Sequence, residues 1–346
     1  MGNSDLESLL LKYMEVESTT GNEGKFAEVV AKDLEEAGWQ VTRQPLSLNS
    51  ARVNLLATRG SSPKRLMFNT HLDTVPPYIP PSQDDGNIYG RGSNDAKGQL
   101  ACQISAANEL TRRDPKLAEQ LALLFVVGEE VDHVGMSEAN KLLDGSVEYL
   151  VVGEPTELKF ATIQKGVLKV YLKAKGIAGH SGYPSAGESA IHKLIPVLND
   201  VLNHQWPKDK TVGETTLNIG TIKGGQAQNA WAAEAEANIM FRVTTSVADI
   251  KRQLEEVVKG RCQIETLTHN EPVVLDGSPL ESMDEDQVAF NTDLPYYAHL
   301  DKLRAKFLFG AGSIKNAHSA DEFMPKKELH QCRDALVQLA IKFLSK

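Results

Sequence analysis

The chain has 346 residues, of which 41% are hydrophobic and 24% are charged, and its formal net charge is −9. A chain of this length usually folds into more than one domain, so two domains are expected. The acidic balance and the lack of a long Lys/Arg run argue against nucleic acid and membrane surfaces as partners. No segment reaches the run of about 18 apolar residues that could cross a bilayer.

The cellular location is predicted from the cysteines and the first residues. Cys102, Cys262 and Cys332 are odd in number and far apart, which is typical of buried thiols in a reducing compartment. The opening MGNSDLESLLLKYM lacks the basic and long apolar segments of a signal peptide. These features predict a cytoplasmic protein, unless a leader segment has been removed.

The first half of the chain alternates between helical and strand patterns. Residues 5–38 have helical apolar spacing, interrupted by the turn residues STTG at 18–21. Strands are then expected at 65–69, 121–127 and 149–152, and helices at 96–112 and 135–143. Such β-α-β alternation predicts an α/β domain with a mostly parallel sheet sandwiched by helices.

The pattern changes near residue 165. The sequence then predicts, in order, the strand VLKVYLKAKG, a helix at 186–203, two further strands, a helix at 246–259 and the strand CQIETLT. This order, βαββαβ, is the ferredoxin-like arrangement. We therefore expect a catalytic domain made of residues 1–164 and 273–346, with an inserted ferredoxin-like α+β domain at 165–272.

Acidic residues and histidines follow the expected strands of the first domain. In parallel sheets, ligands bind outside the carboxyl ends of the strands, so the loops that carry these residues should converge. In NTHLDTVP, His71 and Asp73 are two residues apart, so in a strand their side chains would point to the same face. The set is His71, Asp73, Asp95, Glu129, Glu130, Glu154 and His318.

Each of these residues also has a simpler reading. Asp95 could be a helix N-cap, the pair Glu129-Glu130 could be a solvated turn, and His318 could be a surface histidine. All of these alternatives would have to coincide at one sheet edge, which favours a shared site. Oxygen donors with two imidazoles and no thiolate suit Zn²⁺, with Co²⁺ or Mn²⁺ as alternatives, in an open catalytic site.

The number of donors predicts two metal ions. One ion could take His71 and Glu154, the other Glu130 and His318, with Asp95 bridging both.

Two residues beside these ligands are left for other roles. Asp73 is expected to accept the second ring N–H of His71 and so fix the orientation of the imidazole. Glu129 should diverge from its neighbour Glu130 and remain available as a general base.

At these residues the sequence resembles the dinuclear zinc amidohydrolases and peptidases. The similar segments are NTHLDTVP, YGRGSNDAKG, VVGEE, VVGEPTE and FGAGSIKNAHSADEF. That superfamily includes acetylornithine deacetylase, succinyl-diaminopimelate desuccinylase, aminoacylase and glutamate carboxypeptidase. The match spans nearly the whole chain, and it implies the ligand and base roles given above.

The resemblance extends to the inserted domain. KAKGIAGHSGYP is similar to the segment whose histidine, here His180, reaches an active site, often that of the partner subunit in a dimer. The resemblance therefore implies a homodimer formed through the inserted domain. It also implies substrate contacts by Asn229 in KGGQAQNAW, by Arg242 in MFRVTTS through the substrate carboxylate, and by the loop of Gly312 in GAGS.

At several positions the sequence departs from the family pattern or allows another role, so the residues of the substrate pocket are not decided by the resemblance. Ala311 stands where the family often has proline, and Ala230-Trp231 replaces a more usual aliphatic pair. His180 could also be a turn residue, and Arg242 an ordinary surface arginine. The remaining histidines are predicted to be structural: His133, His192, His204, His269, His299 and His330.

The predicted function is hydrolysis of the amide bond of an N-acyl amino acid, as in acetylornithine deacetylase and hence in amino-acid metabolism. Glu154 in place of an aspartate resembles the deacylase and carboxypeptidase branches. The alternative is therefore a metallo-carboxypeptidase or dipeptidase acting on a short peptide with a free carboxylate. A non-catalytic metal-binding protein of the same fold is a third possibility, against which the presence of Glu129 argues. The GAG segment lacks the third glycine of a dinucleotide-binding loop.

Overall fold

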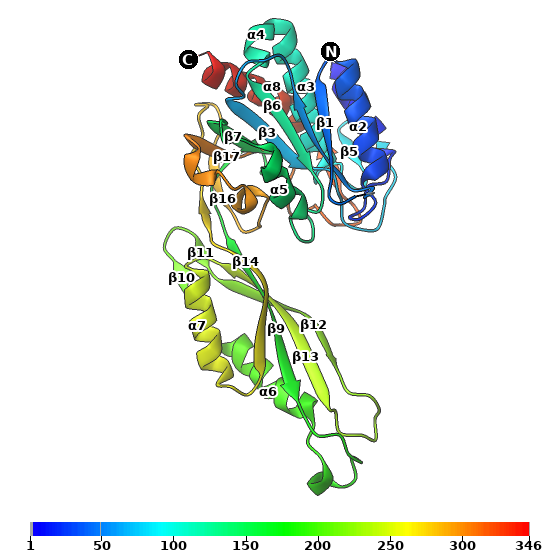
Figure 1. The fold of residues 1–346 in the computed structure, drawn as a ribbon, viewed down its shortest axis with the longest axis vertical. Coiled ribbons are helices and arrows are strands. Elements are labelled where there is room, and N and C mark those ends of the chain that lie inside the picture. The colour runs from blue at the N-terminus through cyan, green and yellow to red at the C-terminus, as the bar shows by residue number, and fades with distance from the viewer. Residues whose placement is uncertain (1–2, 49, 346) are drawn as a thin grey trace. The chain divides into compact units, whose positions relative to one another are not determined.

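The structure is a computed structural model that describes residues 3–48 and 50–345 (Figure 1). The chain forms two compact units. The larger unit comprises Met1–Thr162, Leu275–Asp286 and Thr292–Lys346, and the smaller unit comprises Ile163–Val274 and Gln287–Asn291. None of the described helices is long and apolar enough to cross a membrane.

A six-stranded sheet forms the centre of the larger unit, and the predicted mixed α/β class is confirmed. The strand order is β1-β2-β6-β3-β7-β17. Strands β6, β3, β7 and β17 run parallel to one another, and β2 pairs antiparallel with both of its neighbours, β1 and β6. The strands are β1 (Gln40–Pro45), β2 (Val53–Thr58), β3 (Leu66–His71), β6 (Leu121–Val126), β7 (Tyr149–Val152) and β17 (Ala305–Leu308).

Apolar residues dominate the central strands β6 and β7 and the first half of β3. Every residue of β3 and β6 is buried, as expected for parallel strands that are covered on both faces. The covering helices are α1 (Asn3–Met14), α2 (Gly24–Glu36), α3 (Lys97–Arg113), α4 (Pro115–Ala118), α5 (Val134–Ala139) and α8 (Lys326–Leu344). A small sheet contains β4 (Ser82–Gln83), β5 (Asn87–Tyr89) and β18 (Phe323–Pro325).

Because β3, β6, β7 and β17 are parallel, their carboxyl ends lie at one edge of the sheet. The loops that leave this edge carry the residues predicted to form the site.

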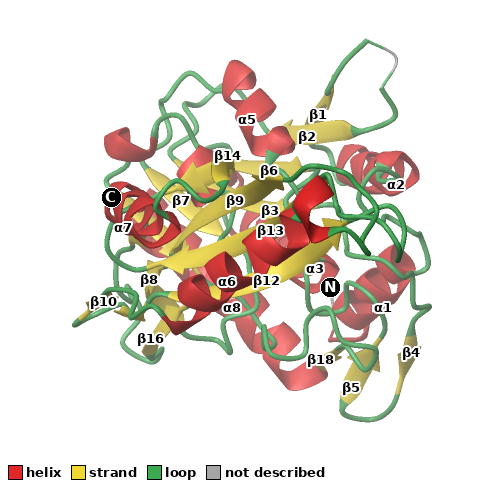
Figure 2. Ribbon diagram, turned by 90° about the horizontal axis from the view of Figure 1, so that it is seen from below, coloured by secondary structure: helices red, strands yellow, loops and turns green. Residues whose placement is uncertain are grey.

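The smaller unit has the element order β9-α6-β12-β13-α7-β14, which is βαββαβ. Its sheet is antiparallel with the order β12-β13-β9-β14. Helices α6 and α7 lie against this sheet (Figure 2). Buried and half-buried residues alternate along β9 and β13, and the buried ones belong to the core that these helices share with the sheet. The elements are β9 (Gly166–Lys175), α6 (Ala190–Asn203), β12 (Thr216–Gly224), β13 (Glu234–Val243), α7 (Val247–Val258) and β14 (Gln263–Asn270).

Short strands complete the structure. They are β10 (Lys208–Asp209) with β11 (Gly213–Glu214), and β8 (Phe160–Gln164) with β15 (Val273–Val274) and β16 (Glu285–Val288).

Candidate metal centre

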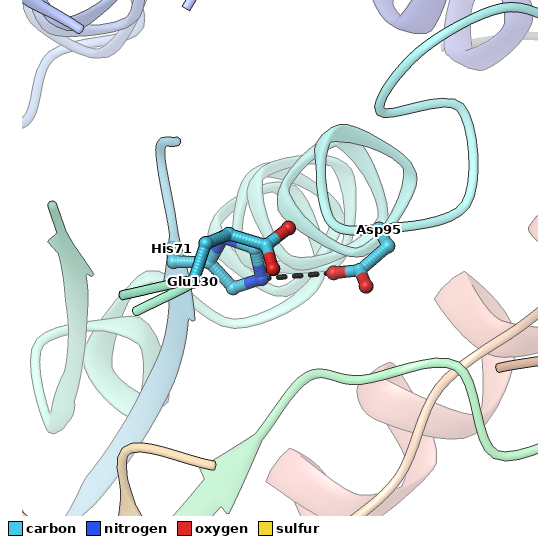
Figure 3. Close-up of side chains that lie close together, drawn as sticks. All are labelled: His71, Asp95 and Glu130. Carbon is cyan, nitrogen blue, oxygen red and sulfur yellow. Dashed lines mark hydrogen bonds and ion pairs between the residues drawn. The ribbon is translucent and has the colours of Figure 1, made fainter. Parts of the chain in front are cut away.

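Two groups of donor atoms meet at the carboxyl edge of the larger sheet. His71 ends β3, and its Nε2 lies 2.9 Å from Oδ1 of Asp95 and 3.8 Å from Oε1 of Glu154. Nε2 of His318 lies 3.2 Å from the other oxygen of Asp95, Oδ2, and 3.0 Å from Oε2 of Glu130. The structure therefore brings together all five residues predicted as ligands, and Asp95 offers one oxygen to each group. Figure 3 shows His71, Asp95 and Glu130 directed toward one another.

The donor spacing fits divalent cations. Two ligands at ordinary Zn–N and Zn–O distances and a tetrahedral angle lie about 3.3 Å apart. The observed separations of 2.9 and 3.8 Å in one group, and 3.0 and 3.2 Å in the other, span this value. Imidazole and carboxylate donors without a thiolate are also the set that an open catalytic zinc site uses.

The charges in this cluster favour cation binding as well. Burial raises the pKa of the Glu154 carboxyl well above its usual value, and burial together with the charge of Asp95 raises the pKa of Glu130. Burial opposes protonation of His71, but hydrogen bonds to nearby carboxylates still raise its pKa. Hydrogen bonds to Asp95 and Glu130 raise the pKa of His318 to about 10. Carboxylates and imidazoles crowded at one place favour a bound cation, which would compete with protons for these donors.

Asp73 is fully buried beside His71, but it makes a different contact from the one expected. Nδ1 of His71 lies 2.9 Å from the main-chain oxygen of Asp73 and 3.6 Å from its carboxylate. The carboxylate instead accepts backbone N–H bonds from Gly128 (2.9 Å), Glu129 (3.2 Å) and Glu130 (3.3 Å). Burial opposes ionisation of Asp73, yet the nearby His71 ring and the hydrogen bonds that the carboxylate accepts from Thr20 and the backbone hold its pKa below the usual value. Asp73 thus fixes the turn that follows β6.

Glu129 lies on that turn, next to Glu130, which is predicted to be a metal ligand. Its side chain is 11% exposed, and Oε1 lies 3.7 Å from Nδ1 of His133. Burial raises the pKa of the Glu129 carboxyl well above its usual value, and the charge of Glu154 adds to the effect. A largely buried carboxyl beside a cluster of possible metal ligands is suited to accept and release a proton.

Comparison with known proteins agrees with this geometry. The model of peptidase family M20/M25/M40 matches residues 67–342. The chain belongs to this family. It is therefore a metal-dependent peptide hydrolase, as the resemblance in sequence predicted.

Curated relatives give the same assignment to the M20 family. A Peptidase M20 domain-containing protein of Schizosaccharomyces pombe is 37% identical, covering 94% of this chain and 82% of that protein. A "Probable carboxypeptidase" of Paracoccidioides brasiliensis is 33% identical, covering 99% and 87%.

Two solved structures share the fold over almost their full lengths. A tripeptidase of Staphylococcus aureus has a TM-score of 0.82 at 19% identity, with 100% of both chains covered. A dinuclear metal-binding M20 peptidase of Bacillus subtilis has a TM-score of 0.74 at 14% identity, with 99% of this chain and 98% of that one covered.

In this M20 peptidase, a buried ion pair that was not predicted from the sequence supports the loop of Asp95, the residue shared by the two donor groups. Oε1 of Glu322 accepts backbone N–H bonds from Gly92 (3.0 Å), Asn94 (3.1 Å) and Asp95 (3.1 Å). Oε2 of Glu322 pairs with Nη1 of Arg91 at 2.6 Å, and both side chains are buried. Glu322 thus holds the backbone of the loop that carries Asp95. The motif AHSADEF contains this glutamate, but only the folded chain shows what it contacts.

Gly312 has a packing role beside the site. Its φ is +77°, and a Cβ there would overlap Oδ1 of Asn94 and lie 2.8 Å from Cγ of the same side chain. Asn94, which is fully buried, donates from Nδ2 to the main-chain oxygen of Ser313 (2.6 Å) and to Oδ1 of Asn316 (2.7 Å). Glycine therefore lets the segment before His318 pack against the neighbour of Asp95.

The remaining predicted residues lie in the smaller unit. His180 and Asn229 are exposed on two loops that pair with each other, through an isolated β-bridge between His180 and Ala230. The backbone N–H of Ser181 donates to the main-chain oxygen of Asn229 at 2.9 Å. Arg242 is half-buried on β13. The structure thus brings the His180 and Asn229 loops together and places Arg242 within the adjoining sheet.

Proposed function

We propose that the protein is a dinuclear-metal carboxypeptidase or dipeptidase that cleaves an amide bond next to a free carboxylate in a short peptide. The observation that carries this proposal is the pair of donor groups joined by Asp95, with the buried carboxyl of Glu129 beside them. The relatives described as probable carboxypeptidases support this choice of substrate.

An N-acyl amino acid is the second candidate substrate. It presents the same amide beside a carboxylate, and a glutamate at the position of Glu154 resembles the deacylase branch. An acetylornithine deacetylase-type activity, with a role in amino-acid metabolism, therefore remains the runner-up.

Five side chains would hold the ions. His71 and Glu154 would bind one, Glu130 and His318 the other, and Asp95 both. When bound, two divalent ions, Zn²⁺ first and Co²⁺ or Mn²⁺ as alternatives, polarise the scissile carbonyl and lower the pKa of a water.

Glu129 would move the proton. Its carboxylate takes a proton from water as the water oxygen forms a bond to the carbonyl carbon. It then gives that proton to the leaving nitrogen as the C–N bond breaks. The backbone N–H bonds to Asp73 keep Glu129 and the ligand Glu130 in fixed register during this transfer. Positioned general-base catalysis of this kind contributes about 10²–10⁴-fold to the rate.

The smaller unit would supply substrate contacts. We assign to His180 a hydrogen bond to the developing oxyanion, either in its own chain or across a homodimer formed through residues 165–272. Asn229 and Arg242 would bind the substrate, Arg242 through its carboxylate, and the loop of Gly312 would border it. Residues 165–272 would then serve as a lid and dimerisation domain of a cytoplasmic enzyme.

A hydrolysis screen of the Zn²⁺-loaded protein tests the proposal. It compares N-blocked dipeptides, the same dipeptides with an amidated C-terminus, N-acetyl amino acids and N-succinyl-diaminopimelate. We expect release of the C-terminal amino acid from the blocked dipeptides and a large loss of rate with their amides. Preferential turnover of the N-acyl amino acids would select the deacylase. Equal turnover of free and amidated C-termini would overturn recognition of the carboxylate.

A further inference from the structure

His133 lies beside the proposed base although nothing in its sequence setting predicts a role there. It precedes α5 in a left-handed conformation with φ 56°, and its backbone N–H donates to the main-chain oxygen of Gly128 at 2.7 Å. The residue is 8% exposed. Its ring stacks on Tyr296 with a centroid distance of 4.2 Å and an interplanar angle of 15°. Backbone and ring are thus both held in place.

One ring nitrogen of His133 faces two carboxylates. Nδ1 lies 3.0 Å from Oδ1 of Asp293 and 3.7 Å from Oε1 of Glu129. Both neighbours are acceptors, so the tautomer with its hydrogen on Nδ1 satisfies this geometry. The 3.0 Å contact is a hydrogen bond, and a shift of about 0.7 Å would bring Glu129 to the same distance. Asp293, whose side chain is 2% exposed, is therefore the anchor, and Glu129 is the neighbour within reach.

We propose that His133 is a positioning residue that sets the direction of the Glu129 carboxylate. The Nδ1–H of its ring, which Asp293 and Tyr296 hold in place, faces Oε1 of Glu129 and attracts that carboxylate toward one orientation. This inference rests on the proposed function, in which Glu129 carries the proton. Misplacing a reacting group by about 1 Å can lower a rate by about 10²-fold, so the contact matters even though the role of His133 is exerted through Glu129.

Two substitutions distinguish the effect of the Nδ1–H donor of His133 from the effect of its stacked ring. His133→Phe keeps an aromatic ring over Tyr296 and removes the Nδ1 hydrogen. His133→Asn removes the stack, retains a short side-chain donor, and suits the left-handed backbone. We expect kcat to fall between about 10- and 100-fold in His133→Phe with KM and metal content almost unchanged. His133→Asn should recover a substantial part of kcat. An unaltered kcat in His133→Phe would overturn the proposal.

Combining His133→Phe with Glu129→Gln distinguishes positioning from a general structural effect. If His133 acts through Glu129, adding His133→Phe to Glu129→Gln should lower the residual kcat by less than about 2-fold. A full multiplication of the two losses would overturn the inference. Asp293→Asn weakens the hydrogen bond that holds His133 and is a second test should His133→Phe fail to fold. It should likewise lower kcat alone but have less than about a 2-fold effect in Glu129→Gln.

The same experiment separates this inference from the proposed function. If Glu129→Gln retains normal turnover, the proposed function fails, and the inference fails with it. If Glu129→Gln loses turnover while His133→Phe and Asp293→Asn do not, the inference alone fails.

Discussion

Replacing Gly312 by alanine tests how closely the segment before His318 is packed against the metal loops. The residue has φ +77°, so any side chain there carries the left-handed conformational cost of roughly 1–2 kcal/mol. Gly213 provides a matched control in the smaller unit, because its φ is +83° and a Cβ added there would have no atom within 4 Å. Alanine at Gly213 should carry that backbone cost and nothing further.

At Gly312 a second cost is added. The new Cβ would overlap Oδ1 of Asn94 and lie 2.8 Å from its Cγ, below the 3.4 Å at which ordinary contacts begin. Asn94 must then rotate away from the main-chain oxygen of Ser313 and from Asn316, to which it donates at 2.6 and 2.7 Å. Two hydrogen bonds are worth about 1 kcal/mol each, so the total is about 3–4 kcal/mol against about 1–2 kcal/mol for the control.

The assay compares bound zinc and kcat in the two variants. Since Asn94 is bonded to Asp95 along the chain, its displacement should move the bridging carboxylate, and a shift near 1 Å predicts a loss of about 10²-fold in kcat. Gly213→Ala should keep both zinc content and kcat. Equal behaviour of the two variants would refute the packing argument for Gly312.

The contacts of the larger unit lead to three further predictions. Glu322→Gln should lower the free energy of unfolding of the larger unit by about 3–5 kcal/mol, and hence its melting temperature, because the buried Arg91 guanidinium loses its carboxylate partner. The control Glu281→Gln, at an exposed position, should leave the melting temperature unchanged. His71→Ala should weaken mainly one zinc equivalent and Asp95→Ala both, as measured by elemental analysis; equal losses would contradict the bridging role. His71 and His318 both have raised pKa values, that of His318 being about 10, so zinc binding at neutral pH should release protons and tighten as pH rises. Calorimetry in buffers of different ionisation enthalpy measures that release, and its absence would contradict the predicted charge state.

The central strands and the ligand cluster were accessible from sequence for physical reasons. Residues 121–126 form an uninterrupted apolar run, and residues 66–68 begin β3 with three apolar side chains, as expected for strands that are covered on both faces. Metal chemistry requires particular donor types, so the histidine and carboxylates that follow such strands are conspicuous. The strands β1 and β2 were missed because their sequences, QVTRQP and VNLLAT, are interrupted by polar residues and partly exposed.

The supporting contacts were not accessible from sequence. Arg91 and Glu322 pair across 231 residues, and spacing along the chain gives no register between loops so far apart. His133 resembles any other histidine until its ring is seen beside Asp293 and Glu129. Likewise, HxD spacing predicts that Asp73 lies near His71, but it does not say whether the carbonyl or the carboxylate is the nearer acceptor.

The central claim is that two ions held through Asp95 enable hydrolysis beside a free carboxylate. The most direct measurement is a Zn²⁺ titration of the metal-depleted protein, in which bound zinc and hydrolysis of an N-blocked dipeptide are followed in the same samples. We predict that both quantities saturate at two equivalents per chain, with no turnover before zinc is added. Full activity in the depleted protein, or saturation of binding and activity at a single equivalent, would contradict the account.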